Sequence, residues 1–178
     1  MDATISLTVD GKRHALTVDT RTTVLDALRE RLDVTNPKKG CDHGQCGACT
    51  VLLSDGDSDG DGAGGRRRVL SCLALAVAHD GDSITTAGGL APEGELHPVA
   101  EAFLDHDAYQ CGYCTPGQIC SAVGVLDEIA AGHPSAASAD LTGPATVDRE
   151  EIAERMSGNL CRCAAYGNIV SAIAEVAR

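Results

Sequence analysis

Nine cysteines are the residues of this chain with the most evident chemistry, and they are unevenly spread over its 178 residues. Disulfides are disfavoured because the cysteine count is odd and the N-terminal stretch lacks the charged and apolar regions of a secretory signal. Thiols at such spacings point instead to metal ligands. Eight of the cysteines form two groups, the first being Cys41, Cys46, Cys49 and Cys72, and the second Cys111, Cys114, Cys161 and Cys163.

The first group has the spacing C-x4-C-x2-C, followed at a distance by Cys72. This is the ligand spacing of plant-type [2Fe–2S] sites. The three glycines of "KKGCDHGQCGACTVLL" let the backbone fold closely around a cluster and turn N–H groups toward its sulfur atoms, which offsets the negative charge of the cluster. Zinc bound by four cysteines is the alternative, but zinc sites favour paired C-x2-C knuckles. The spacing therefore favours iron and sulfur.

The second group consists of a C-x2-C pair and a C-x-C pair. By itself it suits zinc or thiol redox chemistry as well as a cluster. Both pairs lie at the ends of expected helices, in "YQCGYCTPGQ" and "GNLCRCAAYG", where helix N-termini offer N–H groups and positive dipole ends to an anionic cluster. A second cluster is the simplest interpretation. The remaining Cys120 is expected to pack as a small apolar residue.

The elements expected to position the first group are mostly strands. Apolar and polar residues alternate on both sides of Asp10-Gly11, which predicts a β-hairpin over residues 2–19. "TTVLDALRERL" predicts a helix capped by Thr22 or Thr23. "CTVLL", "RRVLSCLALA" and "DSITTA" are interpreted as further strands. Residues 1–86 are therefore expected to form a small α+β domain.

The second half of the sequence is helical in pattern. Four segments have helical periodicity: "LHPVAEAFLDHD", "PGQICSAVGVLDEIAAG", "DREEIAERMSG" and "AYGNIVSAIAEVAR". We expect a four-helix bundle over residues 95–178, preceded by a linker at 87–95. Residues 132–146 are predicted to be a long exposed loop that could lie against a partner.

Composition excludes several other functions. A net charge of −12 argues against binding to nucleic acid or anionic membranes. No apolar run approaches the roughly 18 residues of a membrane span, so the protein is expected to be soluble. Residues 55–65 match part of a calcium-loop pattern, but Arg66 stands where the bidentate Glu is required, so a solvated insertion is the preferred interpretation.

Together, "GCDHGQCGACTV", "SCLALA", "YQCGYCTPGQ" and "GNLCRCAAYGNI" resemble the two-[2Fe–2S] subunit of the molybdenum hydroxylases, the xanthine dehydrogenase and aldehyde oxidase family. The resemblance covers nearly the whole chain and is strongest to the bacterial periplasmic aldehyde oxidoreductases. It implies a plant-ferredoxin-like β-grasp domain (residues 1–86), then a linker and a helical [2Fe–2S]-binding domain (87–178). It also implies a three-subunit assembly with a molybdopterin-binding large subunit, which usually carries the cytosine dinucleotide, and an FAD-binding medium subunit.

The resemblance also assigns roles to the cysteines. The first group would bind the outer cluster on the flavin side, and the second would bind the inner cluster near molybdenum. Gln110 and the backbone of Cys163 would contact the molybdopterin, although a surface amide is the alternative for Gln110.

The function implied is the passage of single electrons from the molybdopterin centre to FAD, with no catalytic residue in this chain. Aldehyde oxidation to a carboxylic acid is the expected overall reaction. Hydroxylation of a purine, an N-heterocycle or CO is the alternative, as is a free-standing two-cluster carrier or a metal-stapled structural module. The cytoplasm is the expected location, or the periplasm if a twin-arginine leader has been removed.

Overall fold

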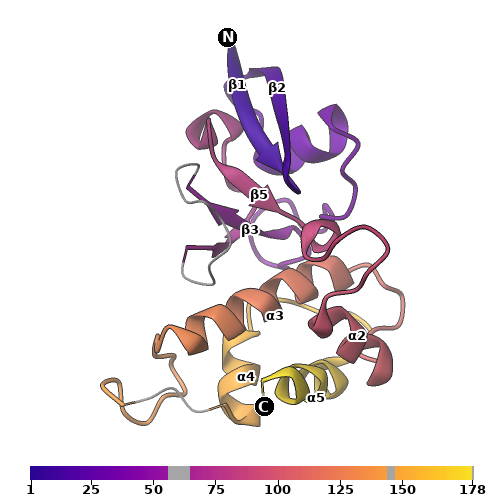
Figure 1. Cartoon of the computed structure of the whole chain (residues 1–178), viewed down its shortest axis with the longest axis vertical. Helices are drawn as coiled ribbons and strands as arrows, with labels where there is room; N and C mark the ends of the chain where they lie inside the picture. The colour runs from indigo at the N-terminus through magenta and orange to yellow at the C-terminus, as the bar shows by residue number, and fades with distance from the viewer. Residues whose placement is uncertain (56–64, 144–146, 178) are drawn as a thin grey trace.

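The computed structural model describes residues 1–55, 65–143 and 147–177. A mixed sheet occupies one half of the molecule and helices occupy the other (Figure 1). Most of the candidate calcium segment, residues 56–64, and the end of the predicted long loop, residues 144–146, lie outside the described residues. No helix in the described ranges is both long and apolar enough to cross a membrane.

The predicted hairpin is confirmed. Strands β1 (Asp2–Val9) and β2 (Lys12–Asp19) pair antiparallel over their full length. Asp10 and Gly11 form the turn with φ angles of 48° and 76°. A two-residue hairpin turn requires this left-handed conformation because it matches the right-handed twist of the two strands. The carboxylate of Asp10 then accepts hydrogen bonds from the backbone N–H and the hydroxyl of Thr86, which ties the turn to the end of the sheet half.

The sheet has the strand order β2-β1-β5-β3-β4. Its other strands are β3 (Thr50–Ser54), β4 (Arg67–Leu70) and β5 (Ser83–Thr85), and β5 pairs parallel with β1. The predicted helix starts as α1 (Val24–Asp26), capped by the Thr23 hydroxyl, and continues as a π-helix over Ala27–Arg31. Short 3-10 helices follow at Ala76–His79 and Ala87–Gly89.

The strand predicted over "RRVLSCLALA" is correct only for its first residues. The β4 strand ends at Leu70, and the chain then turns, with Leu73 N–H donating to the Leu70 carbonyl at 2.9 Å. Ser71 holds this end, because its hydroxyl donates to the Cys49 carbonyl at 2.7 Å. The early turn places Cys72 next to Cys49 instead of extending it along the sheet.

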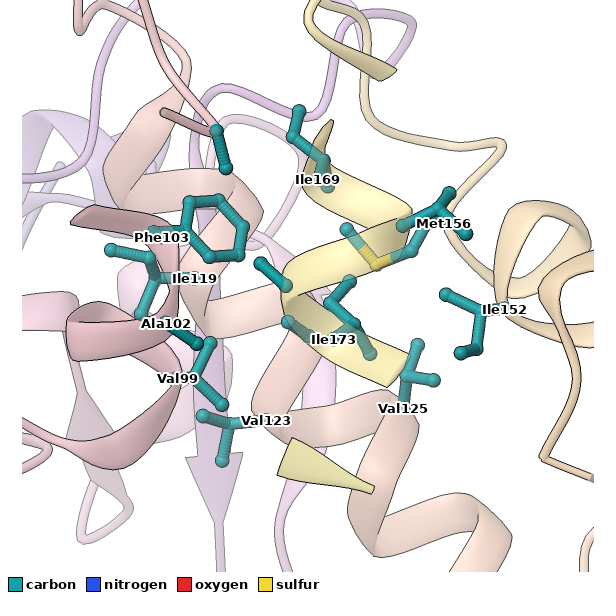
Figure 2. Packing of buried hydrophobic residues seen from close by; sticks show 14 of the residues in the cluster. Val99, Ala102, Phe103, Ile119, Val123, Val125, Ile152, Met156, Ile169 and Ile173 are labelled. Carbon is teal, nitrogen blue, oxygen red and sulfur yellow. The ribbon is translucent and has the colours of Figure 1, made fainter. Parts of the chain in front are cut away.

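All four predicted helices of the second half are present: α2 (Pro98–Asp105), α3 (Thr115–Ala130), α4 (Arg149–Arg155) and α5 (Tyr166–Val176). They share one aliphatic core, to which Phe103 contributes the only phenylalanine of the chain (Figure 2). Cys120 is fully buried in this core, as predicted. The core extends into the other half through Leu52 of β3, while Val51 and Leu53 face the core of the sheet half.

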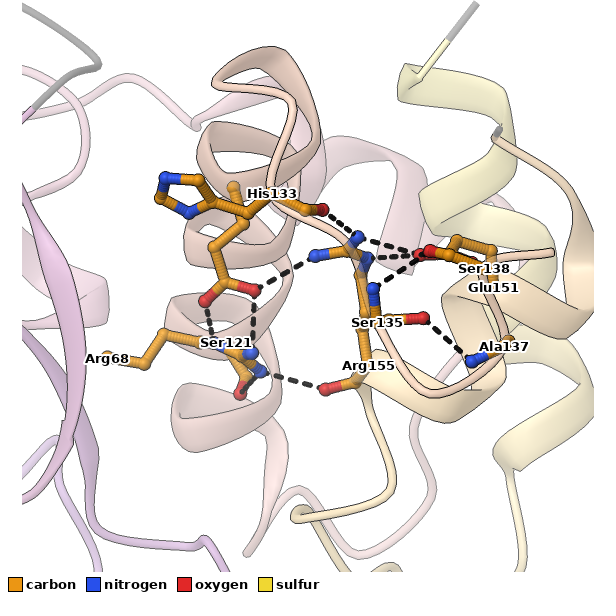
Figure 3. A network of polar contacts seen from close by, with 9 residues as sticks. Arg68, Ser121, His133, Ser135, Ala137, Ser138, Glu151 and Arg155 are labelled. Atoms are coloured by element: carbon orange, nitrogen blue, oxygen red, sulfur yellow. Dashed lines mark hydrogen bonds and ion pairs between the residues drawn. The ribbon is translucent and has the colours of Figure 1, made fainter. Parts of the chain in front are cut away.

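A network of charged side chains joins β4 to the helical half (Figure 3). Arg68 of β4 forms a two-pronged ion pair with Glu128 of α3, and its guanidinium also donates to the Arg155 carbonyl. The Arg155 guanidinium in turn pairs with Glu151 at 2.7 Å, and the two side chains are only 3% and 1% exposed. Charges this deeply buried remain in the fold because each has a partner.

Glu151 makes the network sensitive to pH. Burial by itself would raise the pKa of its carboxyl, but hydrogen bonds from Ser135 and Arg155 hold that pKa below its ordinary value. A depressed folded pKa means that the carboxylate stabilises the fold above its unfolded pKa. This contribution is lost as the pH falls through the folded value.

We predict that Arg155→Met lowers the free energy of unfolding by roughly 3–5 kcal/mol, because it leaves the Glu151 carboxylate buried without its cationic partner. Urea unfolding at neutral pH, followed by circular dichroism, measures the loss. Arg67→Met is the matched control, since Arg67 lies on the same strand as Arg68 but is exposed and pairs loosely with Asp55. Its loss should stay below about 1 kcal/mol. Equal losses in the two variants would contradict the prediction.

Candidate metal centres

Three segments of the sheet half bring the first cysteine group together. Cys41 and Cys46 lie in the loop before β3, Cys49 directly precedes that strand, and Cys72 follows the end of β4. Because β3 and β4 pair antiparallel, Cys49 and Cys72 meet at one end of the pair. The side chains are half-buried or buried, and all nine cysteines of the chain are free thiols. The structure thus brings all four predicted ligands to one place.

The four thiols are arranged as two pairs. Cys46 lies within hydrogen-bonding reach of Cys41, and Cys49 within reach of Cys72. Backbone N–H groups, led by that of His43, lower the pKa of Cys41 to about 6. Burial, followed by the neighbouring Cys49 thiol, raises the pKa of Cys72 to about 11. The N–H groups stabilise the thiolate of Cys41, whereas burial and the neighbouring thiol disfavour the thiolate of Cys72. Bound metal cations would offset this repulsion, so the site is suited to four thiolates around a metal centre.

The loop approaches its sulfur atoms as closely as glycine permits. A Cβ atom at Gly40 would lie 2.8 Å from the Cys46 sulfur, so any other residue there would displace the thiol. The backbone N–H of Gln45 donates to the Cys41 sulfur at 3.2 Å. Gly40 therefore serves the close backbone approach to sulfur that the sequence predicted, while Gly44 and Gly47 lie against Leu73 and Gly158.

The loops before α3 and α5 bring the second group together. Cys114 directly precedes α3, Cys111 lies in the same loop, and Cys161 and Cys163 lie between α4 and α5. The thiols again form pairs, with Cys163 in reach of Cys111 and Cys161 in reach of Cys114. Three of these cysteines line a cavity of about 520 Å³. The structure therefore brings this predicted ligand set together as well.

The environment of the second group repeats that of the first. Burial, and then the charge of the neighbouring Cys161, raises the pKa of Cys114 to about 12, while the side-chain amide of Gln118 acts in the opposite direction. The backbone N–H of Tyr113 lowers the pKa of Cys111. The backbone N–H of Ala165, at the start of α5, donates weakly to the Cys161 sulfur at 3.5 Å.

Pairing is the feature that distinguishes the candidate metals. Among the residues that the structure describes, no three histidine, cysteine or acidic side chains converge on a point where one metal ion could sit. Thiols grouped two by two suit a centre of two metal ions with two thiolates on each. Both sites thus fit a [2Fe–2S] cluster.

Gln110 and Cys163, the two predicted molybdopterin contacts, lie side by side. The Gln110 side-chain amide donates to the Cys163 carbonyl at 3.3 Å, on an exposed part of the helical half. The neighbouring Cys111 is also exposed. The Gln110 amide and the Cys163 carbonyl are thus exposed polar groups beside the second cysteine group. They could form hydrogen bonds with a polar ring system.

Direct hydrogen bonds join the cysteine loops to each other. The backbone N–H of Leu160 donates to the Cys46 carbonyl at 2.9 Å, and Leu160 directly precedes Cys161. The hydroxyl of Tyr113, between Cys111 and Cys114, donates to the Lys39 carbonyl at 2.8 Å. Sequence reasoning missed both contacts, and the only available signal was that these residues lie within the quoted cysteine motifs.

Family comparisons agree with two cluster-binding units. Residues 7–77 match the model of the 2Fe-2S iron-sulfur cluster binding domain. Residues 86–174 match the model of the [2Fe-2S] binding domain.

Curated relatives match this chain along nearly its whole length. The aldehyde oxidoreductase iron-sulfur-binding subunit PaoA of Escherichia coli O157:H7 is 54% identical over 97% of this chain and 71% of its own length. The nicotine 6-hydroxylase small subunit of Paenarthrobacter nicotinovorans is 42% identical over 96% of this chain and 87% of its own length.

Solved structures share the fold. A chain of quinoline 2-oxidoreductase from Pseudomonas putida 86 has a TM-score of 0.77 and 38% identity, over 99% of this chain and 96% of that one. The aldehyde oxidoreductase of Desulfovibrio gigas also has a TM-score of 0.77, with 34% identity, over 98% of this chain and 17% of that one. As its cysteine motifs predict, the chain belongs to the two-[2Fe–2S] iron–sulfur subunits of the molybdenum hydroxylase family.

Proposed function

We propose that this chain is the electron-transfer subunit of an aldehyde-oxidising molybdenum enzyme and passes electrons singly from a molybdopterin centre to FAD. One observation carries the proposal: two four-cysteine sites, joined by the Leu160–Cys46 hydrogen bond, in a chain 54% identical to an aldehyde oxidoreductase iron–sulfur subunit. When bound, each [2Fe–2S] cluster accepts and releases one electron, which lets a two-electron oxidation feed a distant acceptor. The eight cysteines hold these clusters.

Two exposed surfaces support a direction of electron transfer from the second cysteine group to the first. Gln110 and the Cys163 carbonyl would receive the molybdopterin, in its cytosine dinucleotide form, from the large subunit, which makes the second cysteine group the inner site. Leu73, next to Cys72, is 61% exposed. An apolar side chain so exposed next to a cysteine site suits burial under a partner, and we assign that partner to the FAD-binding subunit.

The domain division that we propose is a β-grasp domain over residues 1–86, and a linker with a four-helix bundle over residues 87–178. The separate family matches to residues 7–77 and 86–174 support this division, as do the two apolar cores. We place the assembly in the cytoplasm.

A second candidate reaction is hydroxylation of an N-heterocycle. The 42% identity to a nicotine 6-hydroxylase small subunit and the similarity to quinoline 2-oxidoreductase favour it. Aldehyde oxidation ranks first because the identity to the aldehyde oxidoreductase subunit is higher. Purification of the chain with its native partners, followed by turnover assays on aldehydes, purines and N-heterocycles, decides between them.

Metal content tests the basis of the proposal. We predict about four irons and four sulfides per chain, because each of the two sites should hold two of each. Iron, sulfide and zinc analysis of the chain purified without oxygen measures this, together with the visible absorption of the clusters. Zinc in place of iron would refute electron transfer and leave a metal-stapled structural module.

The role of Gln110 can be separated from that of the clusters. We predict that Gln110→Ala leaves both cluster signals intact but weakens molybdopterin retention, since one lost hydrogen bond costs roughly 1–3 kcal/mol. Molybdenum and pterin content of the purified assembly measures retention. Gln45→Ala, which removes an exposed glutamine beside the first cysteine group, should retain the full content. If the Gln110 variant also does so, its amide is only a surface group.

The proposed order of the two clusters predicts that disrupting one cluster has a different effect on electron transfer from disrupting the other. In Cys72→Ser, substrate should still reduce the cluster of the second group, while electrons fail to reach FAD. In Cys114→Ser, the cluster of the first group should stay oxidised when substrate is added. Rapid-freeze EPR of both assembled variants distinguishes these results, since the two reduced clusters lie in different environments. The opposite pattern would show that the order is reversed.

A further inference from the structure

The side chain of Asn159 forms several hydrogen bonds between the sheet half and the helical half. It lies two residues before Cys161 and is 5% exposed. Its side-chain amide nitrogen lies 3.0 Å from the Gly47 carbonyl, 3.3 Å from the Thr50 hydroxyl and 3.2 Å from the Gly117 carbonyl. Gly47 lies between Cys46 and Cys49, and Gly117 lies near the start of α3, just after Cys114. One amide group therefore contacts the loops of both cysteine groups.

The orientation of this amide is itself fixed. The hydroxyl of Ser121 donates to its side-chain oxygen at 2.6 Å, so the nitrogen must face the three acceptors. Arg68, which also pairs with Glu128, donates to the same hydroxyl at 3.3 Å (Figure 3). The contacts of Asn159 thus form part of a continuous buried network and are not a single mobile hydrogen bond.

The second cysteine group is connected to this network by Gln118. This buried residue donates from its amide to the Asn159 carbonyl at 3.1 Å. The backbone N–H of Gln118 donates to the Cys114 carbonyl at 2.9 Å. A chain of hydrogen bonds therefore runs from Cys114, through Gln118 and Asn159, to the loop that carries Cys46 and Cys49.

The backbones around Asn159 are as close as they can be. A Cβ atom on Gly117 would lie 2.5 Å from the Gly47 carbonyl, and one on Gly47 would lie 2.5 Å from the Gly158 carbonyl. Neither clash could be relieved by moving a flexible side chain, because the atoms met are backbone. The separation of the two loops is therefore set at this contact and held there by the Asn159 amide.

We propose that Asn159 is a positioning residue that fixes the spacing of the two cluster sites and thereby the rate at which an electron passes between them. The inference rests on the proposed function, since it presupposes a cluster in each site. The transfer moves one electron from one site to the other and neither forms nor breaks a bond. Its rate falls steeply with distance, so a small separation of the two loops slows it.

The test uses the spin–spin splitting between the two clusters in the fully reduced, assembled protein, measured by low-temperature EPR. Magnetic coupling falls with the cube of the distance, so we expect Asn159→Ala to shrink or abolish the splitting while both individual signals remain. Ser121→Ala, which frees the amide to rotate and also removes the hydroxyl that accepts from Arg68, should reduce it less. Asn168→Ala is the matched control, because the Asn168 amide donates to the Asp107 carbonyl within the helical half alone. Its splitting should equal that of the unmodified protein.

Each outcome is decisive. An unchanged splitting in Asn159→Ala would overturn the proposal and leave Asn159 as a structural residue. If that variant loses its clusters, Ser121→Ala decides: a reduced splitting supports the proposal and an unchanged one overturns it. Absence of iron and sulfide from the unmodified protein would instead refute the proposed function.

Discussion

Thiolates repel each other, and this protein has to bring four of them together at each of two places. The structure meets that constraint in part with backbone N–H groups. Those of His43 and Gln45 face Cys41, that of Tyr113 faces Cys111, and that of Ala165 faces Cys161. N–H groups take up little space, so the loops can close tightly around the sulfur atoms. The glycines and the helix starts near the cysteines follow from the same constraint.

A second constraint is that these loops belong to different halves of the chain. Apolar packing provides part of the junction, since β3 places Leu52 in the core of the helical half and its neighbours in the core of the sheet half. Apolar contacts are not directional, however, and they tolerate sliding. The hydrogen bonds from Leu160, Tyr113 and Asn159 add direction exactly where the two cysteine groups adjoin. Polar contacts at this junction therefore supply geometry more than stability.

The polar contacts of Arg68 on β4 extend that directional junction. Arg68 reaches from the sheet to α3 and to the end of α4, and Arg155 continues the network to Glu151. The hydrogen bonds of the Arg68 guanidinium to Glu128 and to the Arg155 carbonyl are directional, so they favour one placement of β4 against the helices. For a subunit whose proposed task is to relay electrons over fixed distances, a single well-defined arrangement matters more than a large margin of stability. The small aliphatic core is consistent with this priority.

The sequence by itself determined the local elements and the ligand groups. The hairpin around Asp10-Gly11, the four helices and the two cysteine groups were all predictable because each depends on residues close together in the chain, or on a spacing typical of one kind of site. The tertiary structure decided what depends on distant residues. It ended β4 at Leu70, so that Cys72 meets Cys49, and it paired Cys111 with Cys163. It also placed Asn159 against Gly47, a contact between residues 112 positions apart that no local pattern could reveal. Such contacts depend on how the two halves pack, and packing is a property of the whole fold.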